Sequence, residues 1–310
     1  MISSPAWRLR RIHRTALLLT ALSLLVVLLS AYLRLNGAGL ACANWPACYG
    51  QLLRGEVQAP ALALPRLLHR AAASLILLLV GYLLWLCLRR PSMRQLLRPA
   101  TLLAVLVLAL ALLGFWSSDP RLLLVGFLNI LGGLGLVTCS WRVVLVSSPA
   151  YPERARASTP TLALRLGAAV LSLTVVVGAL IGAGSAALAC PSFPDCGGQW
   201  WPAAVGWPAW QGFATLAAVP PAGDTAAVTL HLLHRWGALA ALLLLLAAAA
   251  LQTLTDDATR KLAVVLLLLL AGEVALGGLV VRSGFNLSLA VAHVVGAAAL
   301  LAALSSLRRR

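Results

Sequence analysis

The chain alternates long apolar runs with short segments rich in arginine, glycine and proline. Eight of these runs are long enough to cross a bilayer as helices, which takes about 20 residues. The predicted spans lie near 15–34, 66–88, 99–117, 121–146, 166–186, 226–252, 261–281 and 288–306. Helices are favoured over strands because lipid offers backbone polar groups no partner, and the sequence lacks the alternation typical of membrane β-strands.

The sequence also repeats itself once, which divides the eight predicted helices into two related halves. The matched segments are 41–51 with 189–199, 67–70 with 232–235, and 129–137 with 293–301. The middle pair reads Leu-Leu-His-Arg in both halves. We therefore predict an all-α integral membrane protein of two pseudosymmetric four-helix bundles, residues 1–150 and 151–310.

Composition agrees with a membrane protein and argues against a partner made of nucleic acid. Hydrophobic residues make up 61% of the chain and charged residues 10%, whereas a soluble domain is about half apolar and a quarter charged. The net charge is +16, but most of the 24 basic residues lie in alternate connections and at the two ends of the chain. Because such connections stay in the cytoplasm, both termini are predicted to be cytoplasmic.

Two pairs of cysteines stand in loops expected on the opposite, outer side. Cys42 and Cys48 are in the first half, and Cys190 and Cys196 are in the second. The outer side of a bacterial inner membrane is oxidising, so we predict one disulfide within each loop. These bonds would shape a lid over an outer-facing site or take part in thiol exchange. Zinc is the alternative, but no histidine accompanies either pair.

Three histidines lie at matched depth near the outer ends of the predicted helices. His69 opens the second helix, while His234 and His293 lie near the starts of the sixth and eighth. The repeat places Asn129 of the fourth helix at the same depth. A histidine inside a membrane either bonds helix to helix or serves a function. Two facing imidazoles can hold a haem iron from opposite sides in a helix bundle, which predicts a haem site at His234 and His293.

Other polar residues accompany these histidines. Arg70 and Arg235 follow the two repeated histidines, and they either bind haem propionates or extend to the membrane interface. His231 is either a partner of the site or, as we favour, an outer-surface residue. Glu273 is the only carboxylate well inside a predicted span, and the sequence shows no obvious partner for it.

These residues resemble the haem A synthase family over nearly the whole chain. The similarity lies in Arg34-Leu35, 38–42, 45–50, 189–196, 198–202, His234-Arg235 and 290–293, of which the second cysteine loop is the most specific. The resemblance implies two four-helix bundles that oxidise a methyl group of haem O to a formyl group, giving haem A for terminal oxidases. It also implies that His234 and His293 bind a b-type haem and that the first half handles the substrate haem.

The first half departs from the family pattern at two positions. The resemblance implies a glutamate three residues before the histidine of the second helix, and a histidine on the fourth helix. This chain retains His69, which the resemblance makes a catalytic residue and a candidate ligand of haem iron. At the other two positions it has Arg66 and Asn129. A carboxylate near the reacting methyl could relay a proton, whereas a guanidinium keeps its proton, and an asparagine is a much poorer iron ligand.

The leading expectation is a membrane oxidoreductase of the bacterial inner membrane, with its haem sites and cysteine loops toward the periplasm. It would convert haem O to haem A with O2 and an external electron donor. The substitutions at Arg66 and Asn129 motivate an alternative, a haem b-binding redox or oxidase-assembly protein without hydroxylation, and a third interpretation is a bundle without haem. Further expected partners are lipid, haem O synthase, oxidase assembly factors and a second copy of the chain.

Overall fold

The structure is a computed structural model that describes most of the chain. The described residues are 5–38, 40, 60–89, 94–117, 122–148, 162–184, 186–201, 224–252 and 257–306. Within them, eight helices are long and apolar enough to cross a membrane. The one β-type pairing in the described residues is an isolated bridge between Cys196 and Gln199. The predicted all-helical, multi-pass architecture is therefore confirmed.

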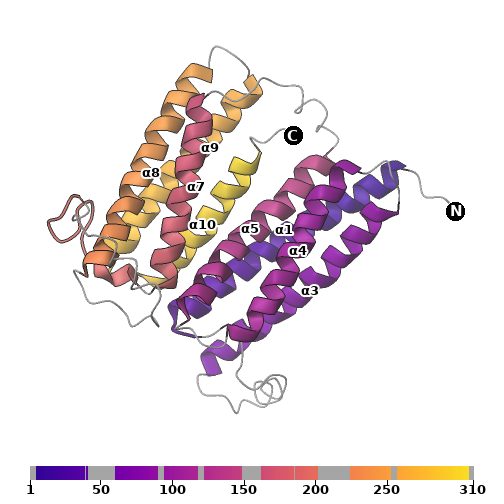
Figure 1. The fold of residues 1–310 in the computed structure, drawn as a ribbon, viewed down its shortest axis with the longest axis horizontal. Helices are drawn as coiled ribbons and strands as arrows, with labels where there is room; N and C mark the ends of the chain where they lie inside the picture. Colours follow the sequence, from indigo (N-terminus) through magenta and orange to yellow (C-terminus); the bar gives the residue numbers. More distant parts are fainter. Residues whose placement is uncertain are drawn as a thin grey trace. The chain divides into compact units, whose positions relative to one another are not determined.

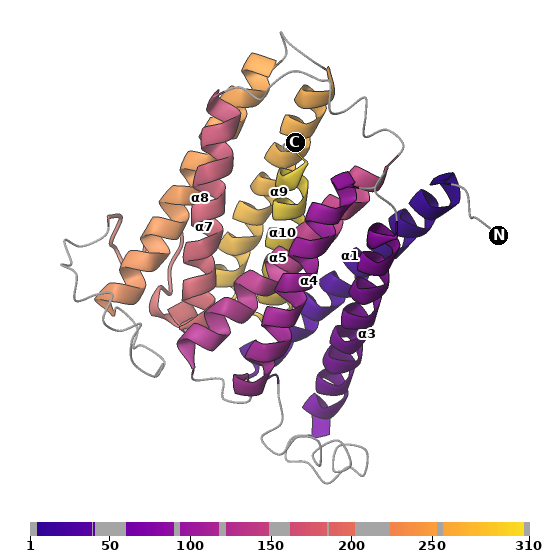
Figure 2. The ribbon, with the colours of Figure 1, turned by 45° about the vertical axis from the view of Figure 1, so that its right-hand side comes forward.

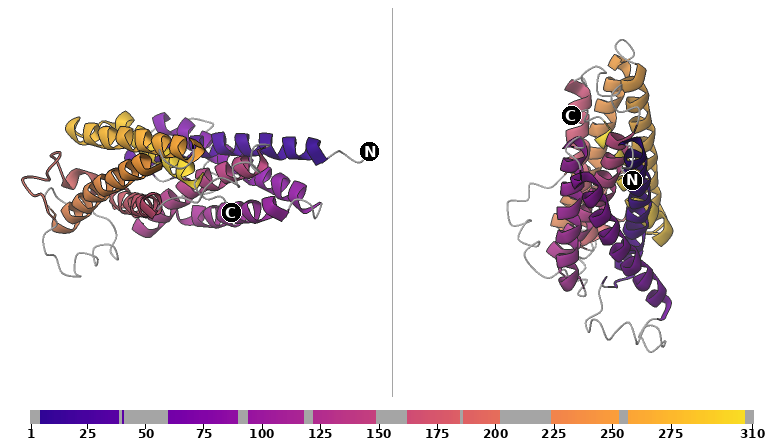
Figure 3. Two further views of the ribbon diagram at one scale, coloured as in Figure 1. Left: turned by 90° about the horizontal axis from the view of Figure 1, so that it is seen from above. Right: turned by 90° about the vertical axis from the view of Figure 1, so that its right-hand side faces the viewer.

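The helices follow the apolar runs closely, with short 3-10 turns at three places (Figure 1). In chain order they are α1 (Pro5–Leu35), η1 (Pro60–Leu62), α3 (Ala63–Leu88), α4 (Arg94–Leu113), η3 (Gly114–Trp116), α5 (Leu123–Ser147), α7 (Leu162–Ala183), η4 (Ala186–Ala189), α8 (Thr225–Gln252), α9 (Asp257–Arg282) and α10 (Leu287–Ser305). Helix α1 begins ten residues before the predicted start at 15 and runs unbroken (Figure 3). Its arginine-rich first turns lie outside the apolar run, but arginine is a good helix former.

The residues group by contact into two compact units. The first contains Met1–Pro120 and Gly132–Pro152, and the second contains Arg121–Leu131 and Glu153–Arg310. The start of α5, with Asn129, thus groups with the second unit, although the repeat assigns it to the first half. The functional division into residues 1–150 and 151–310 stays a prediction.

In the first unit, α3 lies beside both α1 and α4 (Figure 2). Small residues bring the second part of α5 against the same core. A Cβ atom at Gly133 would lie 3.2 Å from Val27 of α1, and one at Gly135 would lie 3.3 Å from Leu106 of α4. Small residues allow this close approach. In a membrane, helices associate through such packing because the lipid tails are as apolar as the side chains.

In the second unit, four helices form a closed ring. Helix α7 packs along α8, α8 along α9 and α9 along α10, and α10 meets α7 again. The pair α7 and α8 lies side by side over most of its length (Figure 2). A Cβ atom at Gly167 of α7 would lie 3.1 Å from Leu245 and 3.3 Å from Leu244 of α8. This glycine therefore allows the two helices to approach closely at this point.

Replacing Gly167 should test that close approach. Gly167→Leu would overpack the contact with α8, and overpacking typically costs about 1–3 kcal/mol. We expect a lower midpoint of thermal unfolding in detergent, followed by loss of the monodisperse chromatographic peak on heating. The control is Gly272→Leu, because Gly272 is exposed on α9 and a Cβ there meets no atom within 4 Å. Equal midpoints for the two variants would contradict the packing argument.

Candidate functional site

Two of the predicted histidines meet inside the second unit. His234 projects from α8 and His293 from α10, with their ring centroids 6.3 Å apart and their planes at 89°. Imidazole nitrogens bind metal ions at about 2.0 Å, so two imidazoles on opposite sides of one iron have centroids roughly 6 Å apart. The observed separation therefore suits a pair of axial haem ligands.

Both rings use Nδ1 toward the protein. Nδ1–H of His234 donates to the carbonyl oxygen of Thr174 at 2.9 Å, and a carbonyl can only accept. Nδ1 of His293 lies 2.7 Å from Oε2 of Glu273. A hydrogen bond at one imidazole nitrogen determines which nitrogen carries the lone pair. Nε2 is thus the nitrogen that each ring can offer to a metal.

A glycine of the preceding helix lies beside each ring. A Cβ atom at Gly178 of α7 would lie 2.8 Å from Cε1 of His234. A Cβ atom at Gly277 of α9 would lie 3.3 Å from Cε1 of His293. Even the smallest side chain at Gly178 would displace its ring. The close approach of helix backbone to imidazole is therefore part of what orients the pair.

Glu273 has a partner that the sequence did not reveal. The sequence shows no obvious partner for it, whereas in the structure its carboxyl group faces His293, and the residue is only 9% exposed. A usable signal was the hairpin of α9 and α10, in which residues at similar distances from the connection lie opposite each other. Glu273 precedes the end of α9 at Arg282, and His293 follows the start of α10 at Leu287 by a comparable length.

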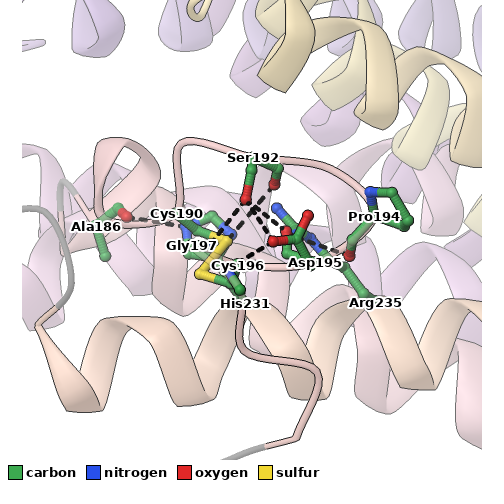
Figure 4. The surroundings of a disulfide bond; sticks show 10 residues. Ala186, Cys190, Ser192, Pro194, Asp195, Cys196, Gly197, His231 and Arg235 are labelled. Atoms are coloured by element: carbon green, nitrogen blue, oxygen red, sulfur yellow. Dashed lines mark hydrogen bonds between the residues drawn. A yellow bond between two sulfur atoms is a disulfide. The ribbon is translucent and has the colours of Figure 1, made fainter.

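The second cysteine loop forms the predicted disulfide. Cys190 and Cys196 are bonded, with their Cα atoms 5.0 Å apart (Figure 4). Both are buried against Val228 and Leu232 of α8. The bond therefore joins the loop to the helix that carries His234. The other predicted disulfide, between Cys42 and Cys48, lies outside the described residues.

Two residues that directly follow His234 hold this loop. Nη1 of Arg235 donates to the carbonyl oxygens of Pro194, at 3.0 Å, and Asp195 (Figure 4). Nε1–H of Trp236 donates to the carbonyl oxygen of Trp200 at 2.8 Å. The loop is therefore held by backbone acceptors, which do not depend on the identity of its side chains.

The same loop also packs against α9, and η4, which leads into the loop, is bonded to α8. A Cβ atom at Gly278 would lie 3.2 Å from the ring of Phe193, so the loop packs beside the helix position next to Gly277. Nε2–H of His231 donates to the carbonyl oxygen of Ala186 at 2.9 Å, and His231 is buried. The favoured placement of His231 on the outer surface is therefore wrong, because it anchors the turn that leads into the loop.

Hydrogen bonds within the loop stabilise its turn. Oδ2 of Asp195 accepts from the backbone N–H of Gly198 at 2.6 Å and from the hydroxyl of Ser192 at 3.2 Å. The hydrogen bond from Gly198 holds the pKa of Asp195 below its ordinary value, and the bond from Ser192 adds to the effect. Because the folded pKa is depressed, this contribution to stability is present above the ordinary carboxyl pKa and is lost as the pH falls.

Several polar atoms of the predicted site residues are buried without a partner among the described residues. Nη2 of Arg235, the residue that follows His234, is one of them. A buried donor without an acceptor is costly, and a guanidinium suits a carboxylate such as a haem propionate. In the first unit, Nδ1 of His69 and Nε of Arg34 are also buried without a hydrogen bond. In the second unit, Nδ1 of His293 and Oε2 of Glu273 lie at ion-pair distance but outside hydrogen-bond geometry.

The remaining predicted residues lie on the expected helices. Arg66 and Arg70 are half-buried on α3, with His69, in the first unit. Asn129 is half-buried on α5, in the segment that groups with the second unit. Within the described part of the chain, no three or more His, Cys, Asp or Glu side chains gather to hold an ion. Two imidazoles suit haem, whereas structural zinc is held by four ligands.

The fold and site together define a multi-pass helical membrane protein with a pair of facing imidazoles in a four-helix unit. Residues 13–305 match the family described as cytochrome oxidase assembly protein (COX15-CtaA). Because the match covers nearly all of the sequence, the chain belongs to this family, which confirms the resemblance found in the sequence.

The relatives to which this chain is similar are each named heme A synthase. A protein of Shewanella oneidensis named heme A synthase is 31% identical over 241 residues, which cover 70% of this chain and 72% of that protein. A heme A synthase of Symbiobacterium thermophilum is 37% identical over 126 residues, covering 39% of this chain and 37% of the relative. One of Rhizorhabdus wittichii is 27% identical over 164 residues, covering 53% and 44%.

The bonds from Arg235 predict how the disulfide responds to reductant. Arg235→Gln removes a donor to the loop, so the buried Cys190–Cys196 bond should open to solvent more often. We expect several-fold faster reduction by a water-soluble phosphine, measured by alkylating the released thiols at timed intervals. Arg282→Gln, which removes an exposed arginine from the end of α9, should leave the rate unchanged. The same rate in both variants would mean that Arg235 does not hold the loop.

Proposed function

We propose that this protein is a haem A synthase, a membrane oxidoreductase that oxidises a methyl group of haem O to a formyl group. Family membership and the shared name of its relatives support the proposal at the level of haem A synthesis. The observation that carries it is the pair of imidazoles of His234 and His293, each with Nδ1 occupied and Nε2 left for iron.

The second unit would hold a resident b-type haem, which supplies one-electron transfer when bound. His234 and His293 are its ligands in this proposal. Arg235 uses Nη1 for the cysteine loop and has Nη2 left to pair with a propionate. The disulfide loop covers the site and limits entry of water, which would otherwise weaken each of these polar contacts.

The first unit would bind haem O, the substrate. His69 is the residue there that we expect to contact substrate iron, and its Nδ1 is buried without a partner among the described residues. Arg70 follows it and carries the charge to pair with a carboxylate. Arg66 keeps its proton, so a proton released during the reaction must reach another acceptor. In this proposal O2 is the oxidant, and an external donor supplies electrons.

A second candidate function follows from the two substituted positions. Arg66 cannot accept a proton, and the amide of Asn129 is a weak ligand for iron. Both changes remove chemistry from the substrate half, while the pair of His234 and His293 is complete. The second candidate is therefore a haem b-binding redox or oxidase-assembly protein that does not hydroxylate.

In either case the proposal places the protein in a bacterial inner membrane, with the histidines and cysteine loops toward the periplasm. The charge distribution of the loops supports this orientation, and the disulfide suits an oxidising compartment. Haem O synthase and oxidase assembly factors are the proposed protein partners, and a second copy of the chain is a further one.

Product analysis separates the two functions. The full chain is expressed in a host that makes haem O but lacks haem A, and the extracted haems are resolved by chromatography and mass spectrometry. Haem A is expected with the wild-type chain and should be lost with His69→Ala, because that variant lacks the proposed contact with the substrate iron. Bound haem b without any haem A would support the second function and contradict the first.

Absorption spectra test the haem ligands directly. His234→Ala or His293→Ala should abolish the low-spin b-type spectrum of the purified protein, because each removes one of two axial ligands. Asn129→Ala is the matched control and should leave the spectrum unchanged, since its amide is not a ligand in this assignment. A wild-type spectrum in both histidine variants would exclude this site.

A further inference from the structure

The Nδ1 atoms of the two paired imidazoles face chemically different groups. His234 donates to a neutral backbone carbonyl, that of Thr174. His293 faces a side-chain carboxyl group, that of Glu273, at 2.7 Å. A carboxylate acceptor draws the Nδ1 proton more strongly than a carbonyl does, and so makes the ring a more basic ligand.

Glu273 fits closely into the helix that carries His293. A Cβ atom at Gly296 of α10 would collide with Oε1 of Glu273 and would lie 2.6 Å from its Cδ. Gly296 is three residues after His293, so the two lie on the same face of α10, one turn apart. The carboxyl group of α9 therefore occupies the gap left by this glycine, with Oε2 directed at the imidazole.

Glu273 is a buried acidic residue within a membrane-spanning helix. A carboxyl group inside a membrane bundle is costly unless it is paired. Among the described residues, the ring of His293 is the group that faces Glu273 at ion-pair distance. His293 in turn keeps 30% of its side chain exposed, so the pair is anchored at Nδ1 while the rest of the ring remains accessible.

We propose that Glu273 is a positioning residue for His293, which fixes the orientation of the imidazole and lowers the reduction potential of the haem. The proposal rests on the proposed function in one respect, that His234 and His293 hold a haem. Electron density donated through a more basic ligand favours ferric over ferrous iron. The two histidines that would hold the haem are thus unequal, one oriented by a carbonyl and the other by a carboxyl group.

The measurement is the midpoint potential of the haem in the purified full-length protein, from a redox titration followed by absorption. Glu273→Gln keeps an oxygen acceptor of similar shape but removes the acidic group, so the potential should rise. Mutation of a residue that contacts a metal-ligating histidine typically changes metal affinity by 10–100-fold. A tenfold change in the ferric-to-ferrous preference corresponds to a shift of 59 mV for one electron, and we expect at least about that shift.

Two glycine variants supply a test that leaves the acid itself in place. Gly296→Ala fills the space occupied by the Glu273 carboxyl group, so it should displace that group from His293 and raise the potential in the same direction. Gly272→Ala is the matched control on α9, because a Cβ there meets no atom within 4 Å. Its potential should equal that of the wild type.

The outcomes distinguish this inference from the proposed function. If the wild-type protein binds no haem, both are overturned. If it binds haem, and Glu273→Gln and Gly296→Ala both keep the wild-type potential, only the role of Glu273 is overturned. If Glu273→Gln fails to fold, Gly296→Ala decides alone. A raised potential in both variants, with Gly272→Ala unchanged, supports the role of Glu273.

Discussion

The arrangement of the second unit depends on one constraint, that an imidazole N–H inside an apolar helix bundle needs an acceptor. Leaving such a group unbonded costs several kcal/mol in an apolar medium, about 2–7 on common reference scales. His234 meets the constraint with the carbonyl of Thr174, and Nδ1 of His293 has the carboxyl group of Glu273 at ion-pair distance. Because each partner group belongs to a different helix from its histidine, these contacts also link α7 to α8 and α9 to α10.

The contacts of the two imidazoles require the helices to approach closely, and glycines make this possible. Gly178 lies beside His234, and Gly296 leaves the space that Glu273 occupies. The cysteine loop extends the same arrangement outward, since Arg235 binds its carbonyls one residue after His234. A change in the loop would therefore act on α8 at the position of the candidate haem ligand, which links the disulfide to the site.

The parts of this structure that could be predicted are those that depend on local sequence. The eight helices follow from apolar run length, and the disulfide of Cys190 and Cys196 follows from a short loop predicted to face an oxidising compartment. The contact of Glu273 with His293 and the burial of His231 depend on helix rotation, which run length does not determine. The early start of α1 could not be predicted from hydropathy, because its first turns are polar. Hydropathy marks only the apolar part of a helix, which lies in lipid.

The repeat gives the contrast between the halves a structural meaning. In the register that matches 41–51 with 189–199, Ser30 stands where Gly178 lies beside His234. In the register that matches 129–137 with 293–301, Ala109 stands where Glu273 faces His293. The first half thus lacks both the glycine and the carboxyl group that lie beside the two imidazoles of the second half. An imidazole with fewer close neighbours can adjust as a ligand arrives and leaves, which suits the proposed substrate, whereas the closely surrounded pair suits the proposed resident haem.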